Sequence, residues 1–245
     1  DFLNALDEVI NACETWDVTT IRASTGQYLI SKWIKEHTDV KVLLIGDGSD
    51  ELTAGYMYFH KAPSSQALHD ENQRLLKDIH LYDVLRADRG ISYNSLEARV
   101  PFLDYRFVDL YMSINPSLRS TEKGEKWLLR SSFDQLVPNH SRSYLPKECL
   151  WRRKEAFSDG VSSMKKAWYT IIQEQAEEMY TDEVFKKKAA NYTHCPPPSK
   201  EALYFREEFD KKFGKHNDHL IPYYWLPKWC GNITEPSARV LDVYK

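Results

Sequence analysis

The sequence predicts a helix-rich α/β domain with few parallel strands. Val42 to Ile45 form an unbroken apolar run that ends at Gly46, which is typical of a strand buried on both faces of a parallel sheet. Most other apolar residues recur at helical spacing, and the chain contains no internal repeat. No linker interrupts the 245 residues, so we expect residues 1–245 to form one domain.

Composition and charge exclude several classes of function. The chain is 42% hydrophobic and 28% charged, which is ordinary for a globular protein. Its net charge of −3 offers no general attraction to nucleic acid or an anionic membrane, so any phosphate binding must come from a local site. No apolar run reaches the roughly eighteen residues of a membrane span. We therefore expect a cytoplasmic (cytosolic) protein without nucleic-acid or membrane partners, and the spacing of its cysteines indicates neither zinc nor a redox pair.

Two helices are expected before the strand. Apolar residues between Leu3 and Cys13 follow helical spacing and predict an amphipathic helix. A second helix follows, with an apolar face formed by Leu29, Ile30, Trp33 and Ile34. Threonine favours helix caps, so Thr19 and Thr20 are most simply interpreted as the cap of this second helix.

Most of the chain after the strand is expected to be helical. Helical periodicity predicts helices over Gln66–Leu81, Tyr105–Ile114, Glu125–Leu136, Trp168–Lys188 and Glu201–Phe213. We expect the second and third of these to lie in the core. Three consecutive prolines predict a stiff, extended loop over Asn191–Ser199.

The loop that follows the strand, residues 46–51, combines two glycines with three carboxylates and a hydroxyl. Gly46 and Gly48 permit a sharp turn and close approach of a ligand, and open α/β sheets bind ligands at the carboxyl ends of their strands. A solvated acidic turn is the simpler alternative. An EF-hand is excluded because it needs glycine at the sixth position of its loop, and the sixth residue counted from Asp47 is Leu52. A Walker phosphate loop is excluded because Ser49-Asp50 follows the second glycine where a Lys-Ser or Lys-Thr pair is needed. The remaining interpretation is a site for a hard cation such as Mg²⁺ that carries a phosphate-bearing substrate.

Two later segments bring further charges. Asp83 and Arg86 are spaced to pair on one helix face, which could equally be a solvated surface. Residues 152–154 are three consecutive cations within Trp151–Gly160, and such a cluster is commonly surface.

Several dense segments resemble the glutamine-hydrolysing asparagine synthetases. Residues 45–51 are similar to the Ser-Gly-Glu-Gly-Ser-Asp-Glu loop of that family, and Gly55 to Pro63 match its Gly-Tyr and Tyr-Phe-His-Lys-Ala-Pro tail. The resemblance covers about Ala12 to Arg239 and includes, in order, Glu14–Ser24, Asp83–Ala87, Glu97–Asp104, Glu125–Arg130, Trp151–Gly160 and Pro222–Trp229. Three positions depart from the family pattern: Ile45 replaces serine, Asp47 replaces glutamate and Ser95 replaces glycine. If the last position requires a positive φ, serine is strained there.

The resemblance implies the C-terminal portion of an adenine nucleotide alpha hydrolase-like (ATP-pyrophosphatase) domain. Such an enzyme uses Mg²⁺ and ATP to convert aspartate to β-aspartyl-AMP, and ammonia from glutamine then displaces AMP. By resemblance, the catalytic residues are Asp47, Arg86 and Lys154, and the aspartate-binding residues are Thr19, Arg22 and Asp83. ATP would contact Gly46, Asp47, Gly48, Ser49 and Lys154, and Asp50 would bind Mg²⁺.

Two motifs of the family do not occur in these 245 residues. The first residue is Asp1 rather than a catalytic cysteine, and there is no Ser-Gly-Gly-Leu-Asp-Ser pyrophosphate loop. We therefore expect the chain alone to be inactive and to be completed by an N-terminal glutaminase and pyrophosphate-loop segment, or by a homologous chain. The alternatives are a non-catalytic relative that binds a ligand or partner, and a related adenylating amide ligase such as a β-lactam synthetase.

Overall fold

The strands form a parallel pair, as the sequence predicts. The computed structural model describes residues 2–119, 121–135, 138, 142–152, 154–155 and 166–237. Strand β1 (Val42–Leu44) pairs with β2 (Glu97–Arg99), with Leu43 opposite Ala98. The described residues hold no other strand, so the helix-rich α/β class with few parallel strands is confirmed.

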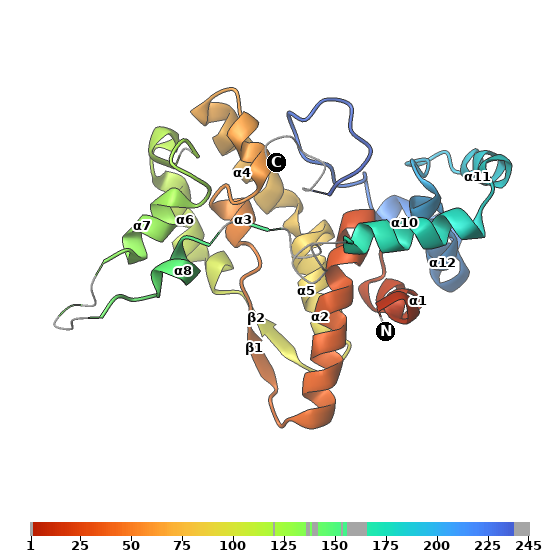
Figure 1. The fold of residues 1–245 in the computed structure, drawn as a ribbon, viewed down its shortest axis with the longest axis horizontal. Coiled ribbons are helices and arrows are strands. Elements are labelled where there is room, and N and C mark those ends of the chain that lie inside the picture. The colour runs from red at the N-terminus through yellow and green to blue at the C-terminus, as the bar shows by residue number, and fades with distance from the viewer. Residues whose placement is uncertain are drawn as a thin grey trace.

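Helices surround this small sheet. They are α1 (Phe2–Cys13), α2 (Val18–His37), α3 (Ser49–Leu52), α4 (Ser65–Asp78), α5 (Asp83–Ser92), α6 (Tyr105–Ser113), α7 (Trp127–Phe133), α8 (Lys147–Leu150), α10 (Trp168–Met179), α11 (Asp182–Ala189) and α12 (Lys200–Phe213). Figure 1 shows α6, α7 and α8 to one side of the strands, α1 and α10–α12 to the other, and α2 and α5 between them. None of the helices in the described ranges combines the length and apolarity needed to cross a bilayer.

The core lies where α1, α2, α5 and α12 pack together. Its largest fully buried side chains include Trp16, Phe59, Phe205 and Phe209. Trp16 lies in the link between α1 and α2 and packs edge-on against Tyr224. The C-terminal segment is therefore part of the core that positions α2.

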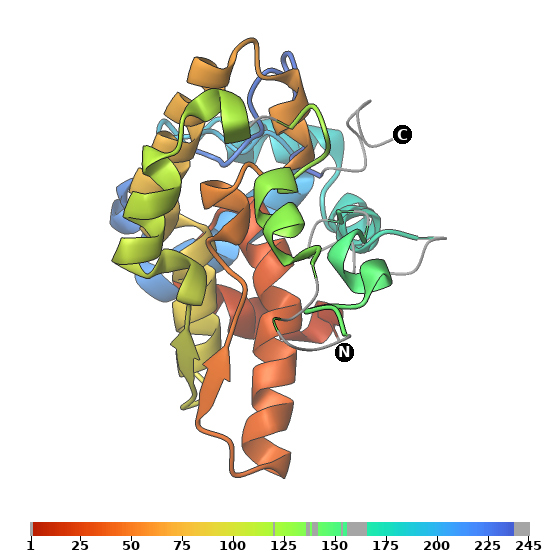
Figure 2. The same ribbon diagram turned by 90° about the vertical axis from the view of Figure 1, so that its left-hand side faces the viewer.

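The strand β1 is not buried on both faces, which corrects the sequence-based expectation. Val42 is 43% exposed and Leu44 is 76% exposed. The reason is that β1 has one neighbour, β2, in the described chain, and no helix lies over Leu44. Figure 2 shows both strands at the same end of the molecule as the C-terminal end of α2. Ile30 and Trp33, from the predicted apolar face of α2, are about half exposed.

Two helix boundaries differ from expectation because of capping. The cap of α2 is Asp17, not Thr19 or Thr20, since the Asp17 carboxylate accepts a 2.8 Å hydrogen bond from the Thr20 amide. The predicted helix Trp168–Lys188 is two helices, α10 and α11. Thr181 starts α11 by accepting a hydrogen bond from the Val184 amide, so a cap divides an otherwise continuous helical pattern.

The expectation that α6 and α7 lie in the core is wrong. Tyr111 is the buried residue of α6, whereas Tyr105 and Leu110 are 73% and 64% exposed. No residue of α7 is buried. Both helices pack at the edge of the domain, where α7 has a different role, described below.

Candidate functional site

The predicted loop forms a tight turn between β1 and α3. Gly48 has a φ of +86°, and a Cβ at this position would lie 2.4 Å from the Leu103 side chain. A side chain is therefore excluded at Gly48 by both backbone and space. A Cβ at Gly46 would meet no atom within 4 Å, so the approach to the loop at that residue is open.

Asp47 is held by two helices. Its carboxylate accepts a 2.6 Å hydrogen bond from Arg86 on α5 and a 3.1 Å hydrogen bond from Gln27 on α2. Gln27 in turn accepts from Arg86 at 3.1 Å, which closes a ring of three side chains. The orientation of Asp47 is thus fixed by residues far from it in sequence.

Arg86 also pairs with Asp83, as their spacing predicts, and so connects Asp83 to the loop. Its guanidinium lies 3.0 Å from the Asp83 carboxylate in addition to its contact with Asp47. Burial by itself would lower the pKa of Arg86, but the charges of Asp47 and Asp83 outweigh burial and raise it. The three residues assigned to the site by resemblance therefore form one charged group.

Glu51 lies beneath this group and was noted in the sequence only as one of three loop carboxylates. It is 2% exposed, accepts a hydrogen bond from the Tyr56 hydroxyl and shares a hydrogen bond with Asp83. Burial and the nearby charge of Asp83 raise the pKa of Glu51 well above its usual value. Burial and the charge of Asp83 thus both disfavour the ionised form of the Glu51 carboxyl under the loop.

Asp50 faces two ammonium groups. Its Oδ1 atom lies 3.1 Å from Lys126 Nζ and 3.2 Å from Lys154 Nζ. Burial would raise the pKa of Asp50, but the charges of Lys154 and Lys126 more than offset it and lower the pKa. Lys154 thus lies beside the loop, as the resemblance implies. Arg153 and Ala156–Gly160 of the same motif are outside the described residues.

Lys126 is a site residue that the sequence analysis missed, because its segment was assigned to the core. It donates a 3.0 Å hydrogen bond to Ser49 Oγ besides its ion pair with Asp50. Its backbone has a φ of +56°, which is uncommon for a residue with a side chain. A Cβ on Gly55 would lie 2.3 Å from Lys126 Cε, so this glycine leaves the space through which the lysine reaches Asp50. The unusual backbone and the glycine are the local signs of a functional position.

Glu125 ties the two lysine-bearing segments together. Its Oε1 atom accepts a 3.2 Å hydrogen bond from the Lys154 amide and a 3.1 Å hydrogen bond from Arg130. The Glu-Lys-x-x-Leu-Arg pattern at residues 125–130 is therefore explained by the site: Glu125 braces Lys154, Lys126 reaches Asp50, and Arg130 orients Glu125.

A divalent cation would find few protein ligands at this loop. Across the described ranges, no three His, Cys, Asp or Glu side chains are grouped so that they could hold a metal. Mg²⁺ commonly binds proteins through one or two carboxylates together with substrate phosphates, and the single carboxylate of Asp50 fits that pattern.

Thr19 and Arg22 point to the C-terminal segment rather than to the acidic loop. Thr19 donates a long 3.4 Å hydrogen bond to the Trp225 carbonyl. Arg22, 3% exposed, donates to Glu201 at 2.7 Å and to Glu235 at 2.5 Å. Together these charges raise the pKa of Arg22 even though burial opposes it. The guanidinium of Arg22 is thus already satisfied by two carboxylates.

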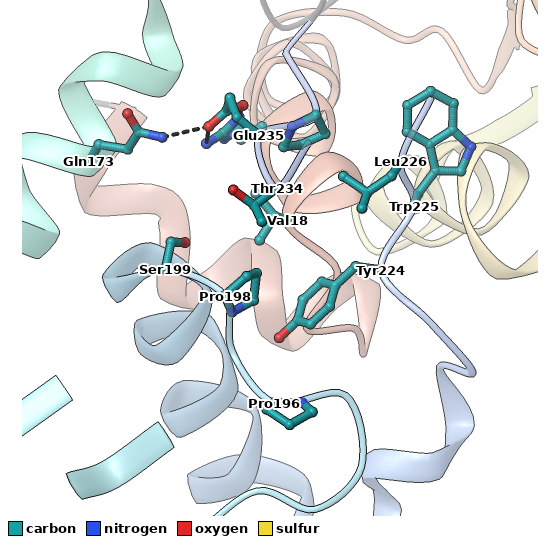
Figure 3. Close-up of a pocket in the computed structure, with 12 residues that line it drawn as sticks. Val18, Gln173, Pro196, Pro198, Ser199, Tyr224, Trp225, Leu226, Thr234 and Glu235 are labelled. Atoms are coloured by element: carbon teal, nitrogen blue, oxygen red, sulfur yellow. Dashed lines mark hydrogen bonds and ion pairs between the residues drawn. The ribbon is translucent and has the colours of Figure 1, made fainter. Parts of the chain in front are cut away.

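A pocket of about 230 Å³ adjoins Arg22. Figure 3 shows Val18, Pro198, Tyr224 and Leu226 around its middle, with Gln173 and Glu235 joined by a hydrogen bond at one end. The walls of the pocket are therefore mainly apolar, and Arg22 and Glu235 lie at its polar end.

Ser95, one of the three departures from the family pattern, has a φ of +60°. The position does require a positive φ, which glycine adopts without strain and serine adopts at a cost of order 1 kcal/mol. Ser95 lies two residues before β2, the strand that pairs with β1, and the loop follows β1.

Comparison with known proteins gives one consistent result. The asparagine synthase family model matches residues 1–73 and 62–234. Over 244 residues the chain is 49% identical to asparagine synthetase [glutamine-hydrolyzing] from Cricetulus griseus and 48% identical to the proteins of that name from Gallus gallus and Homo sapiens. Each alignment covers 99% of this chain and 42% of the relative. The chain therefore spans about two fifths of the length of these curated relatives.

Proposed function

The chain belongs to the asparagine synthase family, and we propose that it supplies the C-terminal part of a site that converts aspartate to asparagine with ATP. The carbon–nitrogen ligase reaction would pass through β-aspartyl-AMP, and ammonia released from glutamine would displace AMP. Activation is needed because a carboxylate is a poor electrophile, whereas an acyl-adenylate has a good leaving group.

One observation carries this proposal: Lys126 and Lys154 converge on Asp50 beside a glycine loop at the end of a parallel strand. A fixed positive charge is what the departing pyrophosphate requires, because its negative charge grows as the bond to AMP breaks. An acidic turn that merely faced water would not need two partly buried ammonium groups.

Each residue of the loop has a role in the proposal. Gly46, Gly48 and Ser49 let the backbone approach ATP, and Lys154 contacts the phosphates that leave as pyrophosphate. Asp50 would hold Mg²⁺, which neutralises phosphate charge. Arg86 holds Asp47 at the reacting end of the loop, where the carboxylate orients aspartate for attack on ATP.

Aspartate would be recognised by Thr19, Arg22 and Asp83. The ring formed by Arg86, Asp47 and Gln27 leaves Asp83 at the edge of the loop, 16% exposed, where it can accept hydrogen bonds from the substrate ammonium. Arg22 would contact a substrate carboxylate only if that carboxylate replaced Glu235, the more exposed of its two partners.

The partners and compartment are proposed on the same basis. The remaining part of a longer protein, or a homologous chain, would provide the glutaminase and the pyrophosphate loop, and the reaction would take place in the cytosol. The exposed apolar residues of β1 and α2, described above, offer a surface on which such a segment could pack.

The test uses a full-length synthetase that contains this chain, with pyrophosphate release measured in ammonia. Asp50→Ala should abolish release by removing the metal ligand, whereas Asp88→Ala, an exposed aspartate on α5, should leave it unchanged. Asp47→Glu should raise the rate, since one methylene moves the carboxylate by about 1 Å and such misplacement can cost about a hundredfold. A lower rate for Asp47→Glu would mean that the loop has adapted to aspartate.

The second candidate is a non-catalytic relative that binds a ligand or partner. It is favoured by three departures, Ile45, Asp47 and the strained Ser95, that fall in functional motifs. In that case ATP would bind to the full-length protein, but neither the wild type nor Asp47→Glu would release pyrophosphate.

A further inference from the structure

Two neighbouring ammonium groups make the net charge around Asp50 positive. One carboxylate faces the ammonium groups of Lys126 and Lys154, both on the same oxygen, Oδ1. That oxygen is buried, so water screens the two cations poorly. The three groups together carry a net charge of +1.

A free divalent cation would meet this arrangement unfavourably. It would have to displace two ammonium groups from Oδ1, or share the oxygen with them at short range. No larger cluster of ligands relieves the cost, because the described ranges contain no group of three side chains fit to hold a metal. Glu51, the adjacent carboxyl, is engaged by Tyr56 and Asp83.

We propose that Lys126 and Lys154 exclude free divalent cations from Asp50, and that the metal binds there only as a metal–nucleotide complex. The inference rests on the proposed function, since the phosphates of the nucleotide supply the anions to which the two ammonium groups transfer. The ion pairs with Asp50 are then exchanged for ion pairs with phosphate, and Asp50 is released to the metal. The order of binding is thereby fixed: nucleotide and metal enter together.

Lys126 is the lysine whose replacement tests exclusion most directly. Ser49 Oγ and the space over Gly55 hold its ammonium group at Asp50, and its segment adopts a strained backbone to place it there. Lys154 keeps its own anchor, the hydrogen bond from its amide to Glu125, when Lys126 is changed. Replacing Lys126 therefore removes one of the two cations and leaves the other in place.

The experiment measures binding of Mn²⁺ alone to this chain by electron paramagnetic resonance. The wild type should bind Mn²⁺ weakly, and Lys126→Met should bind it about tenfold more tightly or better, because a cation next to the carboxylate is lost. Adding Asp50→Asn to Lys126→Met should abolish the gain. Lys123→Met, which removes an exposed cation stacked on Trp127 in the same segment, is the matched control and should bind as the wild type does.

Equal Mn²⁺ affinity in wild type and Lys126→Met would overturn the inference. So would a gain of the same size in Lys123→Met, which would indicate net charge alone. Thermal unfolding of each variant checks that it is folded. If Lys126→Met is not folded, Lys126→Gln repeats the test with a polar side chain.

A second titration separates this inference from the proposed function. Mn²⁺–ATP, added to the full-length protein, should bind more tightly than Mn²⁺ alone, and Lys126→Met should weaken it while strengthening Mn²⁺ alone. Gain of Mn²⁺ binding without any binding of Mn²⁺–ATP would support exclusion but contradict the nucleotide site. Tight binding of Mn²⁺–ATP with an unchanged Mn²⁺ affinity in Lys126→Met would support the nucleotide site but contradict exclusion.

Discussion

Two buried arginines in the part of the chain that the structure describes, Arg22 and Arg86, each bind two carboxylates, and their surroundings differ. Arg22 pairs with Glu201 and Glu235, which lie 179 and 213 residues away in sequence. Arg86 pairs with Asp83, one helical turn away, and with Asp47 of the loop.

The burial of the acidic partners separates the two arginine groups. The side chain of Glu201 is 1% exposed, whereas those of Asp83 and Asp47 are 16% and 9% exposed. The pair of Arg22 with Glu201 joins α2 to α12 inside the core, so breaking it should mainly affect stability. The Arg86 group keeps contact with the open loop, so its charges are available to a ligand. The Arg22–Glu201 pair thus serves mainly the fold, whereas the Arg86 group serves the proposed site.

Loss of Glu201 should have the largest effect on stability. Glu201→Ala leaves the Arg22 guanidinium buried beside a single carboxylate and should lower the free energy of unfolding by about 3–5 kcal/mol. Glu201→Gln, which keeps size and a hydrogen-bond acceptor, should cost less. Urea unfolding followed by circular dichroism measures both losses. A loss below about 1 kcal/mol for Glu201→Ala would contradict the role of the Arg22–Glu201 pair in stability.

Asp17, which caps α2 next to the Arg22 group and accepts a hydrogen bond from the Trp225 amide, should make stability depend on pH. Burial raises the pKa of Asp17 from 3.8 to about 6, although three hydrogen bonds oppose the rise. Between these values the folded state holds a proton that the unfolded state has lost, so this contribution is full below pH 3.8 and is lost as the pH rises through 6.

Asp17→Asn removes this titration while keeping a capping side chain. As the pH is lowered from 7 to 4, the wild type should therefore gain about 2 kcal/mol in unfolding free energy relative to Asp17→Asn. Urea unfolding at several pH values gives this difference directly. A constant difference between the two proteins would show that the Asp17 carboxyl is not perturbed.

Asp47→Asn tests the Arg86 group. Arg86 keeps Asp83 and Gln27 as partners, so we expect a loss of about 1–2 kcal/mol, smaller than that of Glu201→Ala. The same urea experiment applies. A loss as large as that of Glu201→Ala would mean that the loop carboxylate serves the fold as much as the site.

Gly55→Ala should disturb the lysine cluster at a cost of about 1 kcal/mol, near the low end for overpacking. Its Cβ would lie 2.1 Å from Asp50 Oδ1 and 2.3 Å from Lys126 Cε, and both atoms belong to side chains that can move away. Gly46→Ala is the matched control, since its new methyl group meets no atom within 4 Å. Thermal unfolding should therefore separate the two variants. Equal melting temperatures would contradict the close packing of Lys126 over Gly55.

The exposed strand should have the smallest effect on stability. Leu44→Gln removes an apolar side chain that is 76% exposed, so the free energy of unfolding should change by less than about 0.5 kcal/mol. Binding of an apolar dye to this chain should nevertheless decrease, because Leu44 and Val42 form part of the exposed apolar surface. A wild-type chain that binds no dye and stays monomeric at high concentration would count against an open surface.

The sequence predicted the local features of the site well. The turn after β1 and the pairing of Asp83 with Arg86 were expected from residues a few positions apart. Strain at Ser95 was expected if its position required a positive φ, and it does. Most helices were also expected, because apolar periodicity within one segment determines which face is buried. The error at α10 and α11 had a local signal that was passed over, the Thr181 cap.

Contacts between distant segments could not be predicted from these patterns. Lys126 donates to Ser49 across 77 residues, and its own segment reads as an ordinary helix start. The pattern around Thr19 and Arg22 fitted a carboxylate site, but the structure gives Arg22 two internal carboxylates instead.

By itself, then, the sequence determined the strand, the glycine loop and the charged residues around it, since turn geometry and helix spacing act over a few residues. Tertiary structure alone decided that Asp50 faces two lysines, that the pKa of Glu51 is raised, and that β1 is exposed. The physical reason is that charge state and burial depend on which distant segments pack together and how much water they exclude.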